Sequence, residues 1–311
     1  MRRRAFLATG LAAFAAPAAE DYRHTPGFHS LYNLDYDRAI EVFEAQSLEP
    51  EADGDSHNFL ASALLFRTLF RADALDGAVA LSVSDYLHKP KVAMSTSDRS
   101  RFLAALSKAE SISRARIAKN PNSAEALYTL GEAYTNRANL ALLVDKEWRA
   151  ALKTGGEART LHTQALEKDK TLIDAMLVPS IHEYVVGNLP IYLKALGFLV
   201  GFSGDREKGL NGLRMVAAKG LRAKVEAQVL LALVDRREDR PKSALAIMRA
   251  LAGEFPTNHL YRREVANILL DSKRKDEARS EFAELGDPRY RFLKPQRLEL
   301  YKREFEARLR A

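Results

Sequence analysis

Small and apolar side chains recur at a fixed spacing near the C-terminal end of the chain. Ala232, Ala244, Met248 and Leu251 are followed 34 positions later by residues of the same kinds, which are Ala266, Ala278, Phe282 and Leu285. Around Ala244, the apolar positions keep the three- and four-residue spacing of one helix face. The pattern predicts helical hairpins, with one small residue in the first helix and another twelve positions later in the second.

This period resembles that of the tetratricopeptide repeat (TPR), a helix-turn-helix unit of 34 residues. The segment from Leu127 to Tyr134 also resembles the W-x2-L-G-x2-Y signature of the family, with Leu in place of Trp. A TPR unit buries its core only by stacking on its neighbours. The resemblance implies an all-α, right-handed superhelical solenoid.

Earlier units follow from the same register. Two helices that cross closely need Gly, Ala or Ser at the contact. In the family pattern, the small residue in the second helix of one hairpin is followed, twenty-two positions later, by the small residue in the first helix of the next hairpin. Three more pairs fit this spacing, namely Ala39 with Ala61, Ala109 with Gly131, and Ala158 with Ser180. The sequence therefore predicts about six hairpins.

Three units are longer than the family pattern and must carry inserts. The segment from Ala138 to Leu152 keeps helical spacing, so we expect it to lengthen a first helix. The segment from Ala72 to Ser100 contains Gly, Pro and a Ser/Thr-rich run, which favour a short helix and a loop. The third insert contains the apolar stretch Leu189 to Phe202, for which packing on the next unit and a ligand-facing lip both remain open.

The third insert carries a second resemblance. The segments from His182 to Pro190 and from Gly201 to Leu210, with Pro256-Thr257-Asn258 further on, resemble a little-characterised group of exported bacterial TPR proteins. That group is similar at a distance to the eukaryotic inclusion-body-clearance family. The resemblance covers roughly residues 28–285 and implies a repeat fold with no known reaction.

The first eighteen residues have the pattern of a signal peptide. Three arginines follow Met1, a short apolar stretch runs from Ala5 to Ala15, and Ala16-Pro17-Ala18 has the form that a signal peptidase requires. Arg3-Arg4-Ala5-Phe6-Leu7 resembles the twin-arginine export motif, although general secretion stays open. We expect cleavage before Ala19 and a mature protein in the periplasm or cell envelope.

Composition narrows the classes of partner. Removal of Arg2, Arg3 and Arg4 takes the formal net charge from +7 to +4, which is too mild and too mixed with acidic residues to favour nucleic acid. The absence of Cys excludes disulfides and thiolate metal sites. The apolar stretch from Leu189 to Phe202 is shorter than the ~20 residues that a membrane-spanning helix needs.

Motifs of known enzymes are absent from the sequence. There is no H-E-x-x-H, phosphate loop or G-x-S-x-G segment. His182 and Glu183 are adjacent, so on a helix they point about 100° apart and form no metal pair by themselves. We therefore expect no catalytic residue, no metal and no cofactor, while a site assembled from distant residues remains an alternative.

The end of the chain differs from the repeats. Residues 19–286 form the predicted repeat domain, and residues 287–311 a basic C-terminal segment. Its apolar residues, Leu298, Tyr301, Phe305 and Leu309, share one helical stripe. A helix that caps the last repeat explains this pattern. The alternative is an amphipathic helix that associates with anionic lipid at the envelope or with an acidic partner.

The predicted function follows from the concave face, which first-helix side chains line in the TPR fold. With the small crossing residue as position eight, positions two, five, nine and twelve of two units give eight candidate partner-binding residues: Glu125, Tyr128, Glu132, Thr135, Asp174, Leu177, Ile181 and Tyr184. We expect a non-catalytic, exported scaffold that binds a partner protein or a peptide segment there. A module for an envelope lipid or polymer and an enzyme are the alternatives. The identity of the partner and the oligomeric state stay open.

Overall fold

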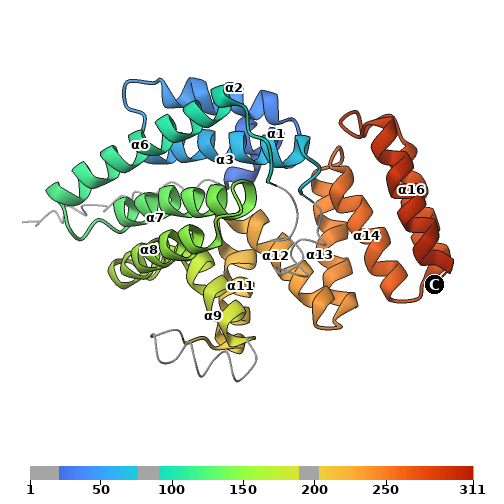
Figure 1. Ribbon diagram of the computed structural model, residues 1–311. Coiled ribbons are helices and arrows are strands. Elements are labelled where there is room, and N and C mark those ends of the chain that lie inside the picture. The colour runs from blue at the N-terminus through green and yellow to red at the C-terminus, as the bar shows by residue number, and fades with distance from the viewer. Residues whose placement is uncertain (1–20, 76–90, 189–202, 311) are drawn as a thin grey trace, which may run out of the picture.

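The computed structural model describes residues 21–75, 91–188 and 203–310, and every regular element in these ranges is a helix (Figure 1). The longer helices pair into six hairpins followed by one last helix: α1 (Pro26–Tyr32) with α2 (Tyr36–Ser47), α3 (Gly54–Arg71) with α6 (Thr96–Lys119), α7 (Ala124–Asn139) with α8 (Trp148–Lys168), α9 (Leu177–Gly187) with α11 (Arg206–Lys219), α12 (Lys224–Arg237) with α13 (Pro241–Glu254), α14 (His259–Asp271) with α15 (Lys275–Ala283), and then α16 (Pro295–Arg310). The predicted all-α solenoid of TPR-like hairpins is confirmed.

Local signals in the sequence set where these helices begin and turn. Five α-helices begin after an Asp or Ser whose side chain accepts a hydrogen bond from a backbone N–H of the first turn, namely α2, α3, α6, α7 and α11. Pro241 stands in the first turn of α13, where its missing N–H costs nothing. Asp239 and Lys273, at equivalent places in two hairpins, take φ values of 55° and 59° in the turn between the paired helices. The repeat therefore extends to backbone conformation.

The small residues lie where helices cross closely, as the sequence predicts. A Cβ on Gly131 would stand 2.9 Å from the His162 ring of α8, and one on Gly209 would stand 2.7 Å from the backbone oxygen of Ser180. Ala39 and Ala244 are fully buried. These positions allow the backbones of paired helices to approach each other, and larger side chains fill the space around them.

The inserts differ in part from the prediction. The segment from Ala138 to Leu152 does not simply lengthen the first helix. After α7 comes one turn of π-helix, η2 (Leu140–Val144), then a turn at residues 145–147, and α8 begins at Trp148. The reason is that Lys146 adopts a φ of 59° and reverses the chain after Val144 is buried. Most of the insert from Ala72 to Ser100 and all of Leu189 to Phe202 lie outside the described residues.

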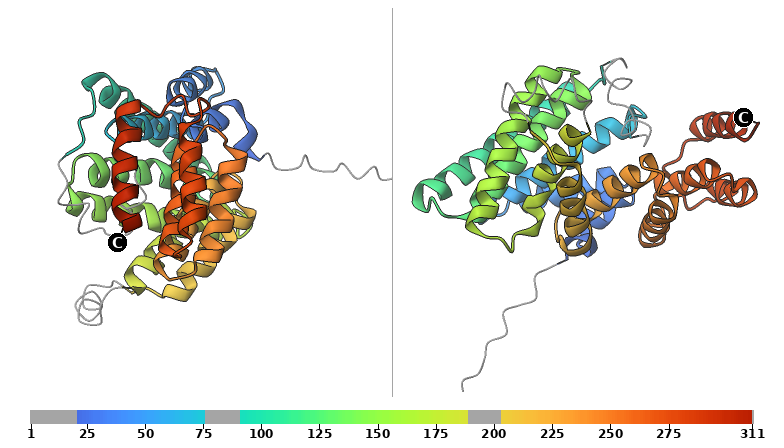
Figure 2. Two further views of the ribbon diagram at one scale, coloured as in Figure 1. Left: turned by 90° about the vertical axis from the view of Figure 1, so that its right-hand side faces the viewer. Right: turned by 90° about the horizontal axis from the view of Figure 1, so that it is seen from below.

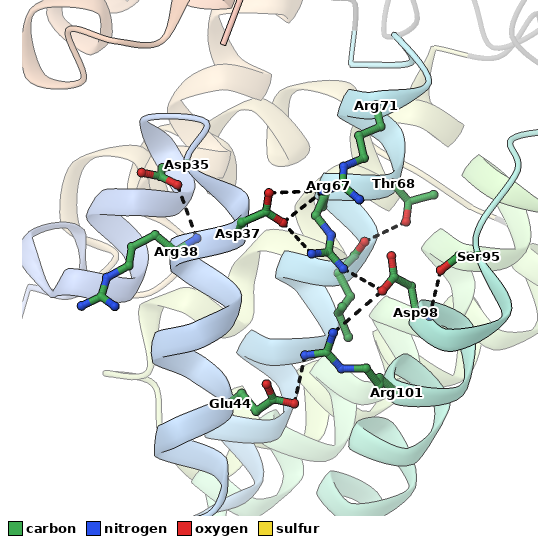
Figure 3. A network of polar contacts seen from close by, with 11 residues as sticks. Asp35, Asp37, Arg38, Glu44, Arg67, Thr68, Arg71, Ser95, Asp98 and Arg101 are labelled. Carbon is green, nitrogen blue, oxygen red and sulfur yellow. Dashed lines mark hydrogen bonds and ion pairs between the residues drawn. The ribbon is translucent and has the colours of Figure 1, made fainter. Parts of the chain in front are cut away.

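A polar network joins the first two hairpins on their outer side (Figure 3). Arg67 of α3, whose side chain is 12% exposed, places one terminal nitrogen 2.6 Å from Asp37 of α2 and the other 2.6 Å from Asp98 of α6. Arg101 of α6 reaches back to Glu44 of α2 at 2.9 Å. One arginine thus connects three helices, which fixes how the second hairpin sits on the first.

The array curls until its first hairpin meets the fifth and sixth, and Figures 1 and 2 show α1 beside the segment from α12 to α14. The amide of Asn258 donates to the backbone oxygen of Tyr32 at 2.7 Å, and the Thr257 hydroxyl donates to that of Asn33 at 2.9 Å. Ahead of α1, Arg23 pairs with Glu254 at 2.8 Å. Residues more than 190 positions apart therefore form one packed body, in which first helices face each other across the interior.

The last helix covers the open side of the sixth hairpin. Tyr301, Phe305 and Leu309 of α16 are buried, and the ring of Phe305 stacks on that of Phe282 with centroids 4.2 Å apart. Two of its charged residues pair with other parts of the fold, Arg308 with Asp271 of α14 and Arg297 with Asp73 after α3. This packing is what a helix that caps a repeat array requires.

Candidate functional site

Five carboxyl groups from four different elements lie near one another, and one arginine, Arg222, is bound among them. They are Asp55 of α3, Glu125 and Glu132 of α7, Asp174 of the short 3-10 helix η3 (Ile173–Met176) and Glu226 of α12. We call these five residues the carboxylate cluster. Each comes from the first helical segment of its hairpin, and together they represent four consecutive hairpins. The curl of the array is what brings them together.

Arg222 lies in the loop that precedes α12, and its side chain is 17% exposed. Its guanidinium is 3.4 Å from Asp55 and 2.9 Å from Glu125, and it lies over the rings of Tyr128 and Tyr22 at 5.1 and 5.6 Å. Burial opposes the charge, but the neighbouring carboxylates, Asp55 first, raise the pKa of Arg222. One guanidinium can neutralise only part of the surrounding negative charge.

Asp174 has a structural role in the site. Its Oδ1 accepts hydrogen bonds from the backbone N–H groups of Leu221, Arg222 and Ala223, at 2.9, 3.1 and 3.0 Å. These donors lie at the start of α12, whose own N-cap residue, Ala223, offers no side-chain acceptor. Asp174 therefore caps the next hairpin from outside and fixes the loop that carries Arg222.

Glu132 lies beside a buried histidine. One carboxyl oxygen is 3.4 Å from Nε2 of His162, which is fully buried, and burial lowers the pKa of His162 to about 4. At neutral pH this imidazole is uncharged and cannot neutralise Glu132. Burial raises the pKa of Glu132 to about 8, with a further contribution from Asp55, Glu226 and Asp174, while Arg222 opposes the shift. Solvent still reaches 28% of its side chain.

Glu226 connects the cluster to the first hairpin. Both of its carboxyl oxygens accept from the Tyr32 hydroxyl, at 2.9 and 3.0 Å. Burial raises the pKa of Glu226 to about 7, although the bond from Tyr32 works in the opposite direction. Two carboxyl groups of the cluster thus hold protons that an exposed glutamate would release near pH 4.5, and they would ionise more readily beside an added cation.

The eight sequence-predicted residues occupy three kinds of position. Glu125, Glu132 and Asp174 belong to the carboxylate cluster, and the side chain of Glu125 is 57% exposed. Thr135, Leu177 and Ile181 are half-buried, and the Thr135 hydroxyl donates to the backbone of Gly131 at 2.9 Å. Only part of the predicted set therefore belongs to one site.

The two aromatic residues among the eight predicted contacts are buried, so they are not open to a partner. Tyr128 and Tyr184 are only 3% and 6% exposed, so neither is an exposed aromatic side chain. Tyr128 packs edge-on against His162 beneath the cluster, and the Tyr184 hydroxyl donates to Glu238 at 3.0 Å. Both face neighbouring helices because each first helix is covered by the next hairpin as well as by its own partner. Replacing either by alanine would lower stability along with any binding.

Sequence reasoning missed Asp55, Glu226 and Arg222. A signal for the two acids was present: in the same register, Asp55 and Glu226 occupy position two of their first helices, as Glu125 and Asp174 do. An acidic residue thus stands at this position in four consecutive hairpins. Nothing comparable indicates Arg222, which lies before a helix and reaches the cluster only through the turn that Asp174 holds.

Two further kinds of feature, a metal-binding group and a membrane-spanning helix, are not found in the described residues. These residues contain no group of three or more His, Cys, Asp or Glu arranged to hold a metal ion. No helix within the same ranges combines the length and apolar character needed to cross a bilayer.

Comparisons with known proteins give a likeness of structure and none of sequence. No protein-family model matches the chain, and no curated protein matches it. Among solved structures, the chain is similar to a thermophilic TPR protein of Thermus thermophilus, with 18% sequence identity and a TM-score of 0.41. The match covers 78% of this chain and 94% of that one.

Proposed function

We propose that the protein is a non-catalytic interaction scaffold that holds an extended, positively charged segment of a partner protein against the carboxylate cluster. The observation that carries the proposal is the excess of carboxyl groups over cations at this place. The carboxylate cluster sets five carboxyl groups against one guanidinium, that of Arg222, and three of the five, Glu125, Glu132 and Glu226, retain exposed surface.

A cationic ligand would remove an electrostatic cost that the free protein bears. Glu132 and Glu226 are held partly protonated because burial and neighbouring acids disfavour their charged forms. An ammonium or guanidinium group placed between them would favour ionisation and form charge-assisted hydrogen bonds, which are among the stronger polar contacts in proteins. A segment with several basic side chains suits a cluster contributed by four consecutive hairpins.

A peptide of alternating glycine and lysine tests this directly. Labelled with fluorescein and titrated with the full-length mature protein, it should bind at pH 8, whereas the matching peptide of glycine and glutamate should not. The double variant Glu132→Gln and Glu226→Gln should weaken binding about tenfold or more, since hydrogen bonds to charged groups contribute about 1.5–3 kcal/mol each. Glu306→Gln, on the exposed face of α16, is the matched control and should bind as the wild type does. Equal binding by the double variant would refute the proposal.

We further propose that the scaffold works in the periplasm or cell envelope, after removal of residues 1–18. This rests on the three arginines, the short apolar stretch and the small-residue cleavage site at the start of the chain. Replacing the arginine pair, Arg3→Lys with Arg4→Lys, should leave uncleaved precursor in the cytoplasm, as fractionation and blotting would show. Mature protein that still appears in the envelope fraction would exclude the twin-arginine route.

A further inference from the structure

A cavity separate from the carboxylate cluster lies where α3 meets α14 and α16. Its volume is about 240 Å³, and its walls come from the C-terminal end of α3, the start of α14, and α16 with the loop before it. A cavity of ~150 Å³ lined by apolar side chains holds a benzene molecule. In proportion, this one admits a ligand of about ten non-hydrogen atoms.

The wall of the cavity is mainly apolar. Phe70 of α3, Leu260 of α14 and Leu300 of α16 line it together with Phe292 and Leu293 of the preceding loop. These side chains are half-buried, so they already pack against their own helices and leave one side towards the cavity. Small-molecule sites commonly combine such a lining with a few converging polar groups.

The charged residues at the cavity are mostly basic. Among the residues that the structure describes, Arg71, Lys294 and Arg297 line it against one acid, Asp73. Arg297 is the most enclosed of the three: its side chain is 20% exposed, its Nε is 3.3 Å from Asp73, and its guanidinium lies over the Tyr301 ring at 4.9 Å. Arg71 and Lys294 are exposed and stand at the rim. Arg71 pairs with Asp37 at 3.1 Å and Arg297 pairs with Asp73, so the charge of Lys294 is left in excess at the rim and favours an anionic group.

His259, at the first position of α14, gives an independent indication of a ligand. It borders the cavity and is only 2% exposed, and within the described part of the chain its Nδ1 has no hydrogen-bond partner. Burial, with Arg263 and Arg297 nearby, lowers the pKa of His259 to about 3, so the ring is neutral at pH 7. A buried polar atom without a partner costs stability and is uncommon in native structures.

We propose that this cavity binds a small amphipathic anion, a carboxylate or phosphate monoester on an apolar body of roughly six to eight carbons. The apolar body would lie among Phe70, Leu260 and Leu300, and the anionic head would face Arg297 and Lys294. His259 borders the same cavity. The site is separate from the carboxylate cluster, whose ligand has the opposite charge.

Calorimetric titration of the purified full-length mature protein tests the proposal with defined probes. Octanoate and hexyl phosphate represent the two head groups, and the stronger of the two identifies which one the site prefers. Octan-1-ol has a comparable tail without charge, and octylammonium carries the opposite charge. We expect at least one anion to bind, octan-1-ol to bind at least tenfold more weakly, and octylammonium to show no binding.

Variants locate the site. Arg297→Leu should weaken binding of the anion at least tenfold, while Arg303→Leu, an exposed position on the same helix, should leave it unchanged. Leu300→Trp fills the cavity and keeps every charge, so it should abolish binding of the anion. This variant tests the location of the site even if Arg297→Leu does not fold. The proposal is overturned if neither anion binds, if octan-1-ol binds as tightly, or if Leu300→Trp binds the anion as the wild type does.

Discussion

At the scale of single residues, the protonation of Glu132 should make stability depend on pH. Its pKa is about 8 in the folded protein and near 4.5 when unfolded, so between these values the folded state holds a proton that the unfolded chain releases. The free energy of unfolding should therefore fall as the pH rises from about 5 to 8.5. Because solvent reaches part of this side chain, the change attributable to Glu132 is about 1–2 kcal/mol rather than the full value of the shift.

Glu132→Gln removes the titrating group and keeps the shape of the side chain. We expect the variant to match the wild type near pH 5 and to be more stable by about 1–2 kcal/mol at pH 8.5, in urea unfolding followed by circular dichroism. Glu306→Gln, which is exposed, should follow the wild type at both values. Identical pH profiles for Glu132→Gln and the wild type would mean that this carboxyl group does not carry the proton.

At the scale of elements, the crossing between α7 and α8 should be sensitive to added volume. A Cβ at position 131 would already meet the fully buried ring of His162 at 2.9 Å, so Gly131→Leu should cost about 1–3 kcal/mol or more through overpacking. Gly156 lies within α8 with no atom within 4 Å of where a Cβ would stand. Gly156→Ala should stabilise the protein by about 0.5–1 kcal/mol. Thermal unfolding of both variants checks the register, which is wrong if Gly131→Leu unfolds at the wild-type temperature.

The elements are also where the sequence was most informative. Small residues at helix crossings cannot be replaced without a clash, so their spacing located all six hairpins in advance. The end of α7 within the segment from Ala138 to Leu152 could not be predicted, because the apolar spacing fits a continuous helix as well as a π-helical turn. The chain reverses there because of the backbone conformation of Lys146. Burial of Tyr128 and Tyr184 was missed for a similar reason: position in a helix does not reveal which neighbouring hairpin covers it.

At the scale of the whole molecule, contact between the first and last hairpins should contribute to stability. Asn258 has two separable roles: its Oδ1 caps α14 at the backbone N–H of Leu260, and its Nδ2 donates to the backbone oxygen of Tyr32, 226 positions away. Asn258→Asp keeps the capping acceptor but loses the donor, whereas Asn258→Ala loses both. We expect a loss of about 1–2 kcal/mol for the aspartate and about 1 kcal/mol more for the alanine.

Hydrogen exchange followed by mass spectrometry distinguishes this closure from local effects. Asn258→Asp should speed exchange in α1 as well as near α14, because Tyr32 and its helix would be held less firmly. Faster exchange confined to α14 would mean that the ends of the array are not coupled. No sequence pattern within a hairpin encodes this closure, which depends on accumulated curvature. For that reason the sequence predicts only some members of the carboxylate cluster. Glu226 lies near Glu132 only because the array of hairpins curls.

If the carboxylate cluster binds cationic segments, the affinity for such a segment must change with pH. Calorimetric titration of the glycine–lysine peptide into the mature protein would be run at pH 6 and pH 8.5, where the lysines stay charged while Glu132 and Glu226 pass from mainly protonated to mainly ionised. We expect the wild type to bind the peptide more tightly at pH 8.5 than at pH 6. For the double variant Glu132→Gln and Glu226→Gln, we expect an affinity almost independent of pH. Binding that is equally strong at both pH values in the wild type, or absent at both, would contradict it.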